Sequence, residues 1–314
     1  MVNIKKAAVV GVGMVGASIA FSLVQQGLFD ELVLIDVNKE KAVGEAMDLS
    51  HGLPYCKRDM KVHAGDYEDV FDAGIIIITA GLAQKPGQTR LDLIKMNARI
   101  MKGIIEEIKR VKAEGLLLIV SNPVDVLTDY AYRISGLPKN RVFGSGTVLD
   151  TARLKYLISR HLSVDTSNVH TVILGEHGDS ELCAWSFTNI AGIPVNDFCE
   201  MRGFHDHEEG MKKLHEEVKD SAYEIIKRKG STYYGVAMAV SHIVEAIFND
   251  QKQILPLSVE LTGQYGISGL ALSIPTIVGR NGAEQVLESP LSKEEKEALV
   301  ASSKTLKEVL DSIK

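Results

Sequence analysis

A glycine-rich segment near the start of the chain carries the first residues with a recognisable chemistry. Gly11, Gly13 and Gly16 are spaced as G-x-G-x-x-G, directly after the apolar run AAVVGV and before a helix-like stretch. In a strand, turn and helix of this kind, the first glycine permits the tight turn, the second admits a pyrophosphate close to the backbone, and the third lets the helix pack on the strand. Asp36 ends the next apolar run, twenty residues after Gly16. Its carboxylate would accept hydrogen bonds from ribose hydroxyls and repel a 2′-phosphate, so the spacing predicts an NAD site.

A second group of residues has side chains suited to acid–base and anion chemistry. His177 lies between glycines in LGEHGDS, where a loop would present its imidazole. A lone histidine of this kind is more often a surface or hydrogen-bonded structural residue. Asp150 and Arg153 are three residues apart on an expected helix, a spacing that also fits an ion pair worth about a few tenths of a kcal/mol. The residue types alone leave the structural and the catalytic explanations open.

The elements expected in the first half alternate in type. Short apolar runs alternate with amphipathic, helix-length stretches; the runs are AAVVGV, ELVLID, GIIIITAG and LLLIVSNP, and the stretches cover 18–26, 39–49 and 91–112. This alternation is typical of βαβ units, and the unbroken apolar runs are typical of strands buried on both faces. We therefore predict an α/β fold with a Rossmann doubly wound parallel sheet.

After about residue 145 the rhythm changes, which indicates a second, α+β domain. We expect a helix over 149–160, a strand that His170 begins and that leads to His177, a charged helix over 208–229, and late strands in QILPLSVEL and LALSIPTIVG. A capping box from Ser292 to Glu295 starts a final helix with Leu299, Leu306, Leu310 and Ile313 on one face. The expected division is an NAD-binding domain over 1–144 and a substrate-binding catalytic domain over 145–314.

Composition excludes several classes of protein. The 314 residues are 45% hydrophobic and carry a net charge of −6, so no global positive field would attract nucleic acid. The longest uncharged run, 261–279, contains four glycines and a proline and does not resemble a membrane span. Three cysteines at unrelated spacings and the lack of a signal-peptide pattern favour reduced thiols in the cytoplasm. His205, His207 and His215 fit no standard zinc spacing, so we expect a solvated helix start and no metal.

Seven motifs occur together, in this order: GVGMVG, ITAG (78–81), QKPGQTR (84–90), SNPVD (121–125), LDTAR (149–153), GEHGDS (175–180) and STYYG (231–235). With them the chain resembles the bacterial-type L-lactate dehydrogenases of the NAD-dependent lactate/malate dehydrogenase superfamily, over essentially its whole length. The resemblance implies a fermentative, glycolytic oxidoreductase that interconverts pyruvate and L-lactate with NADH and NAD.

The resemblance also implies catalytic roles. His177 would give a proton to the substrate carbonyl oxygen and take it back in the reverse reaction, and Asp150 would orient its imidazole. Arg153 would grip the substrate carboxylate in a bidentate fork, and Arg90 would close over the substrate and stabilise charge on the carbonyl oxygen. The substrate residues implied by the resemblance are Gln84, Arg90, Asn122, Asp150, Arg153 and Thr232.

Gln84 decides the expected substrate. Malate dehydrogenases, which this chain also resembles, have an arginine here to meet a second carboxylate, which a neutral amide would leave unpaired. A malate or other 2-hydroxy acid dehydrogenase is the alternative. A non-catalytic NAD-binding protein on the same fold is a second alternative, which the joint presence of His177, Asp150, Arg153 and Arg90 opposes.

Further cofactor contacts follow from the resemblance by matching position. They are Val15, Lys41, Tyr67, Gly81, Leu82, Val120, Asn122 and Ser145, beside Gly11, Gly13, Gly16 and Asp36.

Lys155 and His170 match a pair that binds fructose bisphosphate between subunits of activated bacterial relatives. Lys155 lies two residues beyond Arg153, so the two side chains should point in different directions from one helix. Lysine stands where the relatives usually have arginine; the alternative is an ordinary surface or interface lysine. The resemblance implies a homotetramer with an allosteric bisphosphate site.

Overall fold

The computed structural model describes residues 2–82, 90–205 and 207–312, with only the backbone of Arg90. Gln84, the side chain of Arg90 and Ile313 therefore lie outside the described part of the chain.

A nine-stranded sheet runs through the structure. Its strands are β1 (Asn3–Val10), β2 (Glu31–Ile35), β3 (Lys61–Ala64), β4 (Ala73–Ile78), β5 (Leu116–Ile119), β6 (Val142–Gly144), β12 (Gln253–Thr262), β13 (Ser268–Gly279) and β14 (Gly282–Val286). They lie in the order β14-β13-β12-β6-β5-β4-β1-β2-β3. The strands from β1 to β6 are parallel in the order 3-2-1-4-5-6, whereas β12 to β14 are antiparallel. The predicted doubly wound parallel sheet is confirmed.

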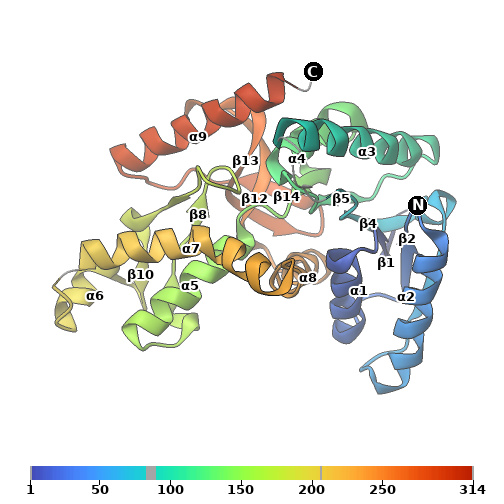
Figure 1. The fold of residues 1–314 in the computed structure, drawn as a ribbon, viewed down its shortest axis with the longest axis horizontal. Helices are drawn as coiled ribbons and strands as arrows, with labels where there is room; N and C mark the ends of the chain where they lie inside the picture. Colours follow the sequence, from blue (N-terminus) through green and yellow to red (C-terminus); the bar gives the residue numbers. More distant parts are fainter. Residues whose placement is uncertain (1, 83–89, 206, 313–314) are drawn as a thin grey trace.

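Helices cover both faces of the parallel strands (Figure 1). Helices α1 (Met14–Gln26) and α2 (Lys39–Gly52) lie on one face, and α3 (Arg90–Arg110) and α4 (Val124–Ser135) lie on the other. Successive residues of β1 point to opposite faces: Ala7 and Val9 belong to the core beneath α1, and Ala8 and Val10 to the core beneath α3 and α4. Burial on both faces is why these strands are apolar without alternation.

The remaining elements follow β6. They are α5 (Val148–Leu162), β7 (Val169–His170), β8 (Ile173–Leu174), β9 (Leu182–Cys183), β10 (Asn189–Ile190), β11 (Ile193–Pro194), α6 (Val195–Met201), α7 (His207–Lys229), α8 (Tyr234–Phe248) and α9 (Lys293–Asp311). The expected capping box of Ser292 and Glu295 starts α9, and Leu299, Leu306 and Leu310 are buried. A separate core beneath α5 and α7 holds Leu154 and Val218.

One expected strand is wrong in detail. His170 ends β7, which pairs with β10, whereas β8 pairs with β9 and leads to His177. The chain changes partner between them because Thr171 Oγ1 bonds Thr188 Oγ1 (2.7 Å) and the Ile173 amide donates to Thr151 Oγ1 (2.9 Å).

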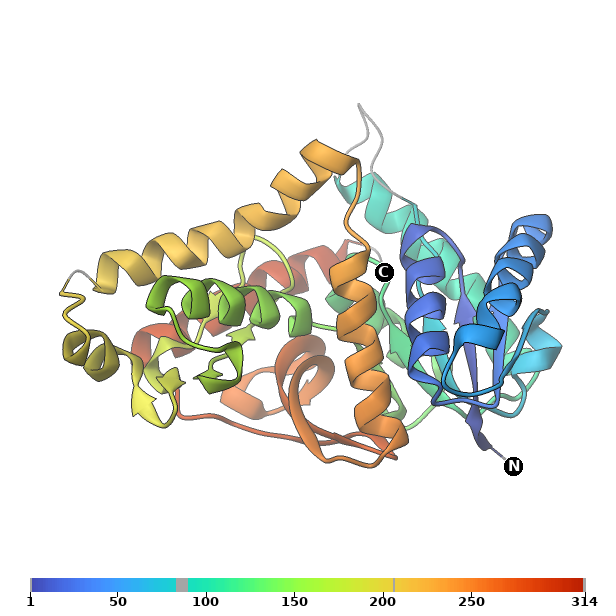
Figure 2. The ribbon, with the colours of Figure 1, turned by 90° about the horizontal axis from the view of Figure 1, so that it is seen from below.

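The two sequence halves meet through a shared sheet and a helix pair. Ser258 of β12 pairs with Gly144 of β6, so the sheet continues from the parallel into the antiparallel strands. Helix α8 packs beside α1 on the same face (Figure 2). Among the described residues, no helix is both long and apolar enough to cross a bilayer.

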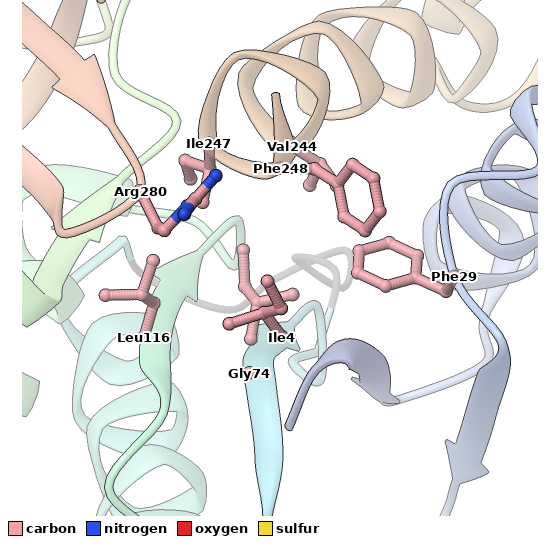
Figure 3. A pocket seen from close by; sticks show the side chains of 9 residues that line it. Ile4, Phe29, Gly74, Leu116, Val244, Ile247, Phe248 and Arg280 are labelled. Atoms are coloured by element: carbon pink, nitrogen blue, oxygen red, sulfur yellow. The ribbon is translucent and has the colours of Figure 1, made fainter. Parts of the chain in front are cut away.

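A small crevice of about 30 Å³ lies at the amino ends of the parallel strands (Figure 3). Its lining is apolar apart from Arg280, and includes Phe29, Leu116 and Phe248. Because it opens at the edge opposite the glycine turn, it is separate from the candidate site.

Candidate active site

The turn between β1 and α1 has the glycine geometry and the free helix amides that a pyrophosphate needs. Gly11 has φ +95°, and a side chain on Gly16 would start 1.9 Å from the Gly11 carbonyl oxygen. Gly13, the residue before α1, has open space where a side chain would lie, and no side chain caps the helix. The first amides of α1 thus remain available to an anion. These features fit the expected NAD phosphates.

Asp36 lies beside this turn at the carboxyl end of β2. Its Oδ2 accepts a hydrogen bond from the Val12 amide (2.8 Å), and its Oδ1 accepts one from the Asn38 amide (2.9 Å). The carboxylate is therefore fixed against the glycine turn and partly exposed, as ribose recognition requires.

The other expected cofactor residues gather at the same edge of the sheet. Gly81, Val120 and Ser145 follow β4, β5 and β6, respectively, so all three lie at carboxyl ends of neighbouring parallel strands. Val15 lies in the first turn of α1, and Lys41 is exposed in the first turn of α2. Tyr67 packs on the core beneath α3, and burial raises its pKa to about 12. Such a shared edge, where the strand order reverses between β1 and β4, is where ligands bind in open α/β sheets.

Asn97 of α3 holds two of these segments together, and the sequence analysis did not identify it. Its side chain is buried; Oδ1 accepts from the Leu82 amide (2.8 Å), and Nδ2 donates to the carbonyl of Asn122 (2.9 Å). Asn122 itself is exposed and precedes a cis bond to Pro123. An asparagine inside an amphipathic helix gives no local signal of this role.

The structure brings His177, Asp150 and Arg153 into direct contact. His177 Nδ1 lies 2.6 Å from Asp150 Oδ2, and Arg153 Nη1 donates to Asp150 Oδ1 (2.7 Å). The Asp150 side chain is only 3% exposed, whereas that of His177 is 27% exposed. The ion pair of Asp150 and Arg153 therefore exists, and the same carboxylate also orients the imidazole.

This geometry favours the protonated imidazole. Asp150 raises the pKa of His177 to about 9, against the opposing effect of burial. Although burial opposes it, the charges of His177 and Arg153 hold the pKa of Asp150 below its ordinary value. With Nδ1 committed to Asp150, a proton on Nε2 is available to an oxygen of a bound molecule.

The loop that carries His177 is fixed by α9. The Glu176 amide donates to Ser302 Oγ (3.0 Å), and the hydroxyls of Ser180 and Ser302 lie 2.9 Å apart. Ser180 also donates to Glu176 Oε2 (2.6 Å). These hydrogen bonds fix the loop on both sides of His177.

Two buried carboxyl groups beside His177 were missed by the sequence analysis. Asp125 Oδ2 accepts a hydrogen bond from the His177 amide (2.7 Å), and burial raises the pKa of Asp125 to about 6. Glu181 lies with one carboxylate oxygen within 4.8 Å of ligand-type atoms of both Asp150 and His177. Burial, with the Asp150 charge, raises the pKa of Glu181 to about 8. Both roles depend on contacts between distant segments.

The histidines near α7 differ from one another. His205 is exposed and His207 begins α7, as expected of a solvated helix start. For His215 the expectation of a solvated side chain is wrong. Its Nε2 is buried without a hydrogen-bond partner among the described atoms, and burial lowers the pKa of its imidazole.

Thr232 lies between α7 and α8. The corner is stiffened by Lys229, whose Nζ lies 3.5 Å from the ring centroid of Tyr233 and 4.3 Å from that of Tyr234. Gln84 and the side chain of Arg90 are outside the described residues, so their places in the site stay predictions.

Lys155 and His170 line one cavity of about 470 Å³, away from Arg153. The exposed side chain of His242 lines it too, and burial lowers the pKa of Lys155. The helix α5 thus presents Arg153 to Asp150 and Lys155 to a separate cavity.

Comparisons with known proteins agree along the whole chain. Residues 5–144 match the family model described as lactate/malate dehydrogenase, NAD binding domain, and residues 147–314 match the one described as lactate/malate dehydrogenase, alpha/beta C-terminal domain. L-lactate dehydrogenase 1 of Clostridium acetobutylicum is 52% identical over 308 residues, covering 98% of each chain. L-lactate dehydrogenase of Acetivibrio thermocellus is 51% identical over 310 residues, covering 99% of this chain and 98% of that protein. The crystal structure of MGS-M5, a lactate dehydrogenase enzyme from a deep-sea metagenome library, aligns with a TM-score of 0.96 at 45% identity, covering 99% of each chain.

Proposed function

The chain belongs to the lactate/malate dehydrogenase family, and on that premise we propose that it interconverts pyruvate and L-lactate, using NADH and NAD. The observation that carries the proposal is the contact of His177, Asp150 and Arg153. The proton donor His177 and the carboxylate-binding guanidinium of Arg153 are both held by Asp150. The glycine turn of the same chain fits a dinucleotide. The curated relatives named above support the choice of L-lactate.

NAD, when bound, supplies or accepts the hydride. His177 gives its Nε2 proton to the carbonyl oxygen during reduction and recovers it from the hydroxyl during oxidation. Asp150 keeps the imidazole in one orientation and stabilises its charge, because the Nδ1–Oδ2 hydrogen bond is charge-assisted. Arg153 has one Nη committed to Asp150, and the rest of its guanidinium serves the substrate carboxylate.

The neutral side chain of Gln84 supports pyruvate over oxaloacetate, since a second carboxylate would find no cation there. We assign Arg90 to the carbonyl oxygen, Asn122 to the same oxygen or the nicotinamide side, and Thr232 to the pocket wall. We assign NAD to the twelve cofactor positions, of which all but Ser145 lie in the NAD-binding domain over 1–144. The catalytic domain over 145–314 supplies the other substrate residues, beside Gln84, Arg90 and Asn122 of the first domain.

We further propose that the cavity of Lys155 and His170 binds fructose bisphosphate and that the protein is a homotetramer. Two basic side chains on one cavity support an anionic effector. Exposed large hydrophobic side chains on several helices support assembly; among those more than half exposed are Met14 and Phe21 of α1, Met47 of α2, Tyr156 of α5 and Met238 of α8. Three unpaired thiols support a reducing compartment such as the cytoplasm.

The test is an assay of NADH oxidation with pyruvate, oxaloacetate and longer 2-oxo acids. Pyruvate should give the highest kcat/KM. A matched variant, His177→Asn, should bind NADH as the parent does, measured by fluorescence, while kcat falls by about 100-fold or more. A preference for oxaloacetate, or near-parent turnover in the variant, would refute the proposal.

A further inference from the structure

Asp125 is a buried carboxylate that joins four parts of the structure at the back of the site. It lies in the first turn of α4 and is 1% exposed. Its Oδ1 accepts hydrogen bonds from Ser258 Oγ of β12 (2.6 Å) and Ser273 Oγ of β13 (3.2 Å). Its Oδ2 accepts one from the backbone amide of His177 (2.7 Å).

The same turn of chain carries Asn122, whose carbonyl is held by Asn97. Asp125 therefore links the segment of Asn122 to the loop of His177 across 52 residues of sequence. Two residues that approach one substrate oxygen are connected by a single side chain. A shift of this carboxylate would move the imidazole relative to Asn122.

Both oxygens of Asp125 act as acceptors, because Oδ1 accepts from the two serine hydroxyls and Oδ2 from the His177 amide. An asparagine offers only one acceptor oxygen and could not accept all three hydrogen bonds. A buried carboxylate also costs free energy unless an opposite charge offsets it. Asp129, one turn further along α4 and equally buried, has Arg133 as a partner, with Arg133 Nη2 2.9 Å from Asp129 Oδ1. Among the described residues, Asp125 forms no ion pair with lysine or arginine. The nearby cation that favours its ionised form is His177.

We propose that Asp125 is a positioning residue for the reaction: it fixes the backbone of His177 and supplies a second negative charge that favours the protonated imidazole. Asp125 acts through His177 and does not touch substrate. The inference rests on the proposed function for the reaction, but the positioning itself belongs to the protein without ligands.

Other charged groups also act on His177 and must be unchanged in a test. Asp150 and Arg153 belong to α5, and Glu181 lies in the segment after His177. The charge of Glu176 raises the pKa of Asp125, and the charge of Lys219 of α7 lowers that of Glu181. None of them is altered by a substitution at Asp125.

The first measurement needs neither substrate nor cofactor. The pKa of His177 is followed by NMR in protein labelled with [13C]histidine, its signal assigned as the one missing from His177→Asn. Asp125→Asn keeps the size of the side chain and an oxygen acceptor but removes the charge, so the pKa of His177 should fall. Asp129→Asn, the matched loss of a buried carboxylate from the same helix, should leave it within error.

The second measurement is kinetic. Asp125→Asn should lower kcat for pyruvate about 10- to 100-fold, the usual consequence of a misplaced catalytic group, while NADH affinity changes less than about twofold. Asp129→Asn should lower thermal stability without moving kcat or the pH profile. If Asp125→Asn does not fold, Ser258→Ala replaces it. Removing that donor leaves Asp125 ionised where His177 titrates, since their pKa values are about 6 and about 9, but it loosens the position of the carboxylate, so kcat should fall by a smaller factor.

An unchanged His177 titration in Asp125→Asn, or an unchanged kcat in Ser258→Ala where only that variant folds, would overturn the inference, as would an equal shift of the His177 titration in Asp129→Asn. A shifted titration in a protein that fails to reduce pyruvate would refute the proposed function and leave the positioning role standing.

Discussion

His177 Nδ1 and Asp150 Oδ2 are 2.6 Å apart, and the other oxygen of that carboxylate is bonded to Arg153. One buried side chain thus sets the direction of the proton donor and of the guanidinium. Because α5 carries both Asp150 and Arg153, the spacing between proton donor and anion anchor is fixed by one helical turn.

The pH dependence of the two directions should be opposite. Asp150 raises the pKa of His177 to about 9. Pyruvate reduction needs the protonated imidazole, so kcat/KM should be level through neutral pH and fall above about 9. Lactate oxidation needs the neutral imidazole and should rise towards the same pH. Initial rates in both directions across this range check the prediction; parallel profiles would contradict it.

Glu181 should make the fold less stable as pH rises. Its pKa, about 8 when folded against 4.5 ordinarily, means that the folded state binds the proton more tightly. The stability contribution is present below about pH 4.5 and is lost as pH rises through 8. Glu181→Gln carries no titrating proton at this position. As the pH rises from about 4.5 to 8, the Tm of the variant minus that of the parent should therefore increase, by about 2–4 °C for each kcal/mol of unfolding free energy that the parent loses. Calorimetry at several pH values measures it, and a constant difference would count against the buried acid.

Gln84→Arg should change the preferred substrate. The added cation meets the second carboxylate of oxaloacetate and is left unpaired by pyruvate, so the ratio of the two kcat/KM values should shift about 100-fold towards oxaloacetate. Gln88→Arg places the same charge four residues along the same segment and is the control. A similar shift in both variants would show a general effect of charge.

Fructose bisphosphate should lower the pyruvate concentration needed for half-saturation. Lys155→Ala and His170→Ala should each weaken that effect about tenfold or more, since the cavity loses a cation. Lys304→Ala removes an exposed lysine of α9, remote from that cavity, and should behave as the parent. An effector response that survives both substitutions would exclude this cavity, and no response in the parent would exclude the activation.

The parallel half of the fold was predictable because its signals are local. Gly11, Gly16 and Asp36 are required by the backbone geometry of one turn and its neighbouring strand, so their spacing is readable without the rest of the molecule. The roles of Asp125 and Glu181 could not be predicted, because they arise from contacts between residues far apart in the sequence. Ser258 lies 133 residues from Asp125, and Ser273 lies 148 residues from it. His215 was misjudged for the same reason, since its burial and its contact with the backbone of Glu181 do not show in its charged neighbours in sequence. The apolar run from His170 was predicted as one strand because partner exchange between β7 and β8 depends on Thr151 and Thr188.

The pairing of β6 with β12 joins the strands beside the glycine turn and the strands near His177 into one continuous sheet. A chain whose halves were joined only by a linker would need to bring them together before reaction. Here the shared sheet and the packing of α8 against α1 hold the two halves in contact. The cofactor edge and the loop of His177 are therefore already placed relative to each other when the chain folds. The entropic cost of bringing the two halves together does not recur in each reaction cycle.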